Sequence, residues 1–81
     1  MPNTHHTLWV SVETWNAEHP TRLLVGRMRL RDYRGLLNGN APSMVRLDDC
    51  QRSERPTGPI EDLFLQSTHI LSVFPLEHYQ R

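Results

Sequence analysis

The sequence has 81 residues, a length that supports one hydrophobic core and therefore one domain at most. Hydrophobic residues make up 37% of the chain and charged residues 22%, which disfavours full disorder but keeps the core small. Nine basic and nine acidic residues cancel, so no overall charge drives binding to nucleic acid or to an acidic membrane. Any such binding would need a local patch of positive charge.

Cysteine content and apolar segment length indicate the cellular location. The single Cys50 excludes an internal disulfide, which is typical of a reducing cytoplasm. No apolar run approaches the roughly 20 residues of a membrane span. The polar residues 1–7 lack the basic start and apolar stretch of a signal peptide. We therefore expect a cytoplasmic protein with no membrane contact.

Two alternating segments at the start of the chain predict antiparallel strands. Residues 8–15 alternate between an aliphatic side and a side that carries Trp9 and Trp15. A short polar connection leads to a second strand over residues 21–30. Gly26, inside this second strand, indicates a bulge, a sharp bend or the close approach of another backbone segment.

Helical spacing replaces the alternation in residues 32–39. We predict a short helix with Asp32 as its N-cap and Asn38-Gly39 as its end. Gly35 weakens this helix, so a loop with one helical turn is the alternative. Three further strands are predicted, over residues 44–51, 60–66 and 69–74.

These elements predict a mainly β fold. Its expected architecture is a small, strongly bent, five-stranded antiparallel barrel with a short helical insert between the second and third strands. Residues 8–75 would form this single domain, residues 1–7 a flexible N-terminal tail and residues 76–81 a C-terminal tail.

The sequence contains no convincing catalytic, metal or cofactor site. Its five histidines are scattered, and the His5-His6 pair lies in the predicted tail. Cys50 and His69 are the only conceivable nucleophile and base, but a free cysteine is more typical of a core position. We therefore expect a protein without cofactor, metal or enzymatic activity.

The arginines form the most informative surface pattern. Arg27, Arg29 and Arg31 are predicted on one face of the second strand, and Arg34 follows in the insert. A strand rise of about 3.3 Å per residue would place these guanidinium groups within about 15 Å of one another. This arrangement predicts a cationic strip.

The strip has two interpretations. With Trp9 and Trp15 as stacking surfaces it would bind single-stranded nucleic acid or a protein partner. Alternatively, carboxylates of neighbouring strands, such as Glu13 and Asp48, would neutralise it, and the tryptophans would pack against the arginine stems.

Two parts of the chain match a known pair of motifs. Residues 24–28, 35–37 and 44–49 resemble the first Sm motif, and residues 65–73 are similar to the second. Sm-like proteins are bent five-stranded barrels that pair their fourth and fifth strands between subunits into rings. Many of them bind RNA at loops inside the ring, so the resemblance implies a barrel that forms a homo-oligomer.

The chain departs from the Sm pattern at its base-binding positions. Ala41 and Val45 lie near the places of the family's Asp and Asn, and Gln66-Ser67 replaces its Arg-Gly. The resemblance therefore implies architecture rather than RNA binding. A family of short uncharacterised bacterial β-proteins, which has no established activity, is more similar in its motifs: Gly26-Arg27, Leu36-Leu37-Asn38, Leu47-Asp48-Asp49 and His69-Ile70 with Val73.

Apolar residues occupy both faces of the last two predicted strands, more than one face of a small barrel can bury. Either the insert and the C-terminal tail cover the excess, or a second subunit does so through Phe64, Ile70 and Phe74. We therefore predict a non-catalytic, homo-oligomeric binding module with a protein partner. Single-stranded RNA binding through the arginine strip and the tryptophans is the alternative function.

Overall fold

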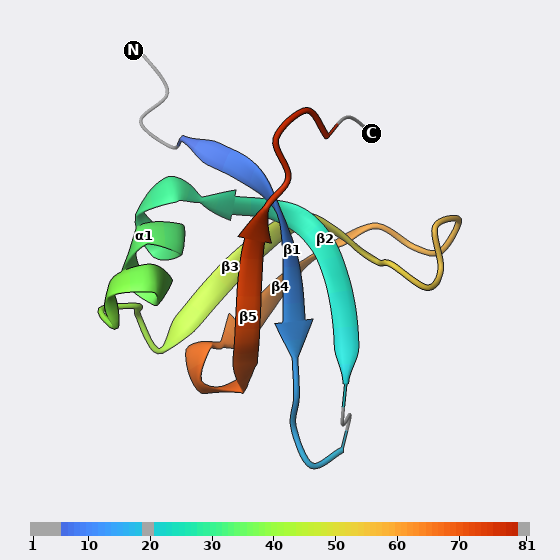
Figure 1. Ribbon diagram of the computed structural model, residues 1–81. Helices are drawn as coiled ribbons and strands as arrows, with labels where there is room; N and C mark the ends of the chain where they lie inside the picture. The colour runs from blue at the N-terminus through green and yellow to red at the C-terminus, as the bar shows by residue number, and fades with distance from the viewer. Residues whose placement is uncertain (1–5, 19–20, 80–81) are drawn as a thin grey trace.

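The computed structural model describes residues 6–18 and 21–79 and contains five strands and one α-helix (Figure 1). The predicted mainly β class, the antiparallel pairing and the helical insert between the second and third strands are confirmed. In chain order the elements are β1 (Thr7–Thr14), β2 (Arg22–Arg29), α1 (Leu30–Asn38), β3 (Met44–Arg52), β4 (Glu61–Gln66), the 3-10 helix η1 (Ser67–His69) and β5 (Ile70–Pro75).

The strands form one sheet in the order β4-β3-β2-β1-β5. Figure 1 shows the sheet strongly bent, with β1 and β5 in front of β3 and β4. The two end strands, β4 and β5, do not pair with each other, so the described sheet is open. Closure into the predicted barrel is therefore not observed, although η1 connects the two end strands directly.

The inner face of the bent sheet holds a small core. Alternation within each strand sends every second side chain to this face. Partly buried residues of β4, β5 and α1 pack against the core from its open sides. The buried hydrophobic residues are Val10, Val12, Leu24, Met28, Val45, Leu47 and Cys50.

Helix α1 begins earlier than the sequence predicts. Arg29 is the N-cap residue and makes no capping hydrogen bond through its side chain, so the prediction of Asp32 as the N-cap is wrong. Asp32 instead lies buried in the first helical turn, where the helix dipole favours a negative charge. The predicted end is confirmed, because Gly39 adopts a left-handed φ of 75° and its N–H bonds to the Gly35 carbonyl.

The strand β3 contains a bulge opposite Gly26. The β2–β3 register shifts between Val25 and Arg27, and Asp49 in β3 has a φ of 51°. A Cβ atom at Gly26 would lie 2.7 Å from Leu47 Cγ and 3.0 Å from the Asp48 carbonyl oxygen. Only glycine allows this approach, which confirms that Gly26 marks a bulge and a close backbone contact.

Replacing Gly26 with alanine should lower the free energy of unfolding by about 1 to 3 kcal/mol, because the added methyl group overpacks the contact with β3. Urea denaturation measures the change. As a control, the double variant Gly26→Ala/Leu47→Ala should be less destabilised than the sum of its two single variants, because truncating Leu47 removes the nearest contact. Strict additivity would contradict the overlap between these positions.

Candidate functional site

The outer face of the sheet, opposite the core, carries two of the residues predicted to bind a ligand. Trp9 of β1 and Arg27 of β2 are cross-strand partners, and Arg27 Cζ lies 5.9 Å from the centroid of the Trp9 ring. The ring of Tyr79, from the C-terminal segment, lies 4.9 Å from Trp9 at an interplanar angle of 52°. Trp9 therefore packs against a neighbouring arginine and a tyrosine.

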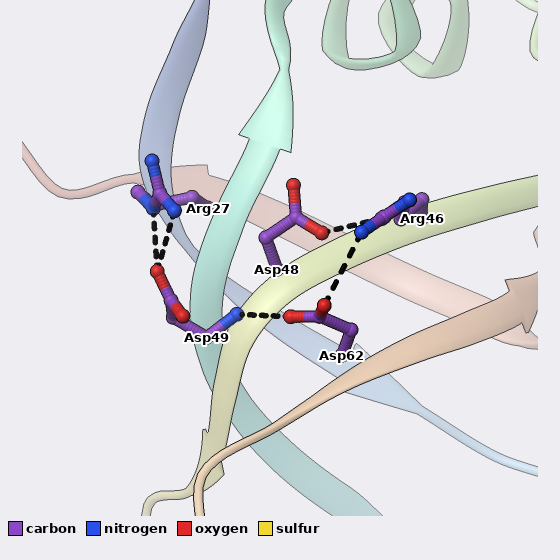
Figure 2. Close-up of polar contacts among 5 residues, drawn as sticks. All are labelled: Arg27, Arg46, Asp48, Asp49 and Asp62. Atoms are coloured by element: carbon purple, nitrogen blue, oxygen red, sulfur yellow. Dashed lines mark hydrogen bonds and ion pairs between the residues drawn. The ribbon is translucent and has the colours of Figure 1, made fainter.

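Five charged side chains form a network around the bulge, which we call the Arg-Asp network (Figure 2). Arg27 donates hydrogen bonds to Asp49 Oδ2 through Nε, at 2.9 Å, and through Nη2. The backbone N–H of Asp49 donates to Asp62 Oδ1 at 3.1 Å. Arg46 links the remaining members, because its Nη2 donates to Asp62 Oδ2 at 3.2 Å and its Nε to Asp48 Oδ1.

The network neutralises Arg27 and Arg46. Its two guanidinium groups and three carboxylates sum to a formal charge of −1. Hydrogen bonding from Arg46 to Asp48, together with the charge of that carboxylate, raises the pKa of Arg46 above its ordinary value. The side chains of Arg27 and Asp49 are 39% and 46% exposed, so water weakens their ion pair.

The carboxylate that neutralises Arg27 differs from both predicted examples. Asp48 faces Arg27 in the strand register, but its side chain pairs with Arg46. Glu13 accepts a hydrogen bond from Ser72 Oγ at 3.2 Å. The partner of Arg27 is Asp49, because the bulge adds one residue to β3 and turns this side chain toward β2.

The other predicted ligand-binding residues do not continue the strip. Arg29 ends β2, whereas Arg31 and Arg34 belong to α1 and not to the second strand. Arg31 Nε lies 3.8 Å from Asp32 Oδ1, and Arg34 is exposed. Trp15 follows the end of β1 and is half exposed. The six predicted residues are thus distributed over three elements and their flanking loops.

The predicted interface residues differ in exposure. Phe64 of β4 is 64% exposed and Phe74 of β5 is 61% exposed. Phe64 lies beneath the guanidinium group of Arg46, whose Cζ is 5.8 Å from the ring centroid. Ile70 instead packs against the core from the start of β5. Of the three predicted interface residues, the two phenylalanines are therefore the exposed ones.

The remaining candidates for chemistry are separated or buried. Cys50 lies in the core, and His69 belongs to η1, where its carbonyl accepts the N–H of Trp15 at 2.8 Å. Among residues 6–18 and 21–79, no group of three or more His, Cys, Asp or Glu side chains has the arrangement of a metal site. His6 is exposed, and His5 lies outside the described residues. No helix in the described part of the chain is long and apolar enough to cross a membrane.

No family model, curated protein or solved structure matches this chain. The resemblances to Sm-like proteins and to short bacterial β-proteins therefore remain predictions from sequence motifs.

Sequence reasoning did not anticipate three members of the network: Arg46, Asp49 and Asp62. One signal was available, since Arg46 and Asp48 are two residues apart in a predicted strand and therefore share a face. The place of Asp62 depends on the β3–β4 register, which shifts at the bulge. No local pattern specifies such a shift.

Replacing Asp49 tests whether backbone conformation or charge dominates at the bulge. Asparagine tolerates a positive φ, so Asp49→Asn should cost less than about 1 kcal/mol of unfolding free energy, whereas Asp49→Ala should cost about 1 to 2 kcal/mol. Urea denaturation at low and high salt measures both variants, with Glu77→Ala as an exposed control. If asparagine costs as much as alanine, charge pairing with Arg27 is the larger contribution.

Proposed function

We propose that the protein is a non-catalytic binding module that assembles into a homo-oligomer through the two end strands of its sheet. One observation carries this proposal: β4 and β5 end an open sheet, and each displays a phenylalanine that is more than 60% exposed. Unpaired strand edges beside exposed apolar side chains favour pairing with another chain.

Other large apolar side chains adjoin the same strands. Ile60 immediately precedes β4 and is 50% exposed, and Leu71 in β5 is 60% exposed. Leaving such residues in water forgoes about 1.5 to 3 kcal/mol for each side chain that could be fully buried. A subunit interface would recover part of this free energy, which matters in a chain whose core is small.

Neither the helical insert nor the C-terminal segment covers the exposed phenylalanines of β4 and β5. Helix α1 packs Tyr33 and Leu36 against the core and leaves Leu37 exposed. Tyr79 of the C-terminal segment packs against Trp9. Phe64 and Phe74 remain exposed in the described chain. We therefore favour a second copy of the chain as the partner that buries them.

The Sm-like resemblance suggests how the copies would be arranged. Pairing β4 of one subunit with β5 of the next would extend the sheet from chain to chain, and a closed ring would leave no free edge. In this proposal the bent sheet acts as an Sm-like half-barrel that its neighbour completes. A cytoplasmic location is consistent with the single, buried thiol of Cys50.

Single-stranded RNA binding through the arginine strip is less well supported. The Arg-Asp network neutralises Arg27, and Trp9 packs beside it against Tyr79. Nucleic-acid binding depends on cationic groups that can replace the counterions of the phosphates. We therefore favour a protein interface as the function of the sheet's edges.

Light scattering coupled to size-exclusion chromatography tests the assembly. At a concentration of about 50 μM the wild type should have a multiple of the 9.5 kDa monomer mass. Phe74→Asp should reduce this mass and keep the circular dichroism spectrum of the folded chain, because the side chain is exposed. Leu37→Asp is the matched control, since Leu37 is also 61% exposed but lies on α1.

Two results would contradict the proposal. A wild-type mass equal to that of the monomer at this concentration would remove the oligomer. An unchanged oligomeric mass in both Phe74→Asp and Phe64→Asp would show that the end strands do not form the interface.

A further inference from the structure

A cavity of about 290 Å³ lies where the long loop between β3 and β4 meets the start of β2. This loop extends to the right in Figure 1. Leu24, Cys50 and Leu63 give the cavity an apolar part that adjoins the core. Small-molecule sites have volumes of about 300 to 1,000 Å³, so the cavity suits a small ligand.

Three arginines line the same cavity: Arg22 from β2, Arg52 from the end of β3 and Arg55 from the loop. Within the described residues, Arg22 and Arg55 form no ion pair. Arg52 has only a long contact of 3.9 Å with Glu54, and both side chains are more than a third exposed. The arginines are therefore available to a ligand, unlike Arg27 in the Arg-Asp network.

The loop that carries Arg55 is held in place by hydrogen bonds. Gln51 Nε2 donates to the carbonyl oxygens of Pro56 and Gly58, at 2.8 and 2.9 Å. The N–H of Arg55 bonds to the Arg52 carbonyl, and the N–H of Gly58 bonds to the Arg55 carbonyl. One side of the cavity is thus preorganised, which lowers the entropic cost of binding.

The charge of the lining indicates the class of ligand. Three arginines and one carboxylate, Glu61, give a formal charge of +2. A phosphate monoester carries about −1.5 to −2 at pH 7 and matches this charge, whereas a carboxylate would leave about one positive charge uncompensated. Guanidinium groups also bind phosphate in a bidentate manner.

We propose that this cavity binds a small phosphate monoester, with the phosphate held by Arg22, Arg52 and Arg55 and an apolar group placed against Leu24 and Leu63. Neither of the proposed interface phenylalanines, Phe64 and Phe74, lines the cavity, although Glu61 and Leu63 bring the start of β4 to its wall. The site adds ligand binding to a protein for which we propose no catalysis.

Isothermal titration calorimetry of the full-length protein with phenyl phosphate tests the proposal. Phenyl phosphate should bind with a dissociation constant below about 1 mM, and more tightly than inorganic phosphate, because only phenyl phosphate has an apolar group. Arg22→Gln and Arg55→Gln should each weaken binding by about tenfold to 100-fold through the loss of charged hydrogen bonds. Arg34→Gln, at an exposed arginine of α1 outside the cavity, should leave binding unchanged.

Two comparisons examine the role of charge without removing an arginine. Glu61→Gln should tighten binding, because it raises the formal charge of the lining from +2 to +3. Binding of phenyl phosphate should strengthen between pH 5 and 7, as the phosphate loses its second proton near pH 6. Benzenesulfonate keeps a single charge over this range and should bind more weakly, with no such pH dependence.

Three results would overturn the proposal. The first is the absence of phenyl phosphate binding at about 10 mM, far above the expected dissociation constant. The second is an equal loss of affinity in Arg34→Gln and Arg22→Gln, which would indicate a nonspecific charge effect. The third is equally tight binding of an oligonucleotide that lacks a terminal phosphate, because its phosphates are diesters.

Discussion

The contact between Gly26 in β2 and the bulged segment of β3 determines the geometry of much of the molecule. At this point a side chain larger than hydrogen would overlap Leu47 and the Asp48 backbone, and the extra residue of the bulge changes the register toward both neighbouring strands. Bulges bend a strand and increase its twist, which helps the inner face to enclose a core built from few residues. The same bulge turns Asp49 toward Arg27 and opens its N–H to Asp62, so the Arg-Asp network depends on it.

Although the formal net charge of the chain is zero, its charges are unevenly distributed over the surface. The Arg-Asp network on the outer face carries −1, whereas the cavity beside the β3–β4 loop carries +2. Each end strand displays an exposed phenylalanine, Phe64 in β4 and Phe74 in β5, and β5 also displays Leu71. We propose different partners for these regions: a second copy at the end strands and a phosphate monoester in the cavity. The exposed phenylalanines support the first proposal, and the arginine-lined cavity supports the second.

Local patterns in the sequence were sufficient for the elements of the fold. Alternation predicted the first three strands, and short apolar segments bounded by turn residues predicted the last two. Asn38-Gly39 predicted the end of α1, because a left-handed terminal residue is a local requirement. The prediction of Asp32 as the N-cap failed because no loop separates β2 from α1. The helix therefore begins at Leu30, directly after the strand, and Asp32 lies inside its first turn. Gly26 was recognised as a special position, since a glycine inside a strand has few other structural explanations.

The sequence by itself determined where the strands lie and, outside the bulge in β3, which of their side chains share a face, because these properties follow from the two-residue period of a strand. Only the tertiary structure decided the partner of Arg27, the partial burial of Ile70 and the cavity that Arg22, Arg52 and Arg55 line together. These relations join residues far apart in the chain through strand register. The bulge in β3 shifts the register toward β2 and β4, and a second irregularity shifts the β1–β5 register between Glu13 and Thr14. Nothing in the local period marks where these shifts lie.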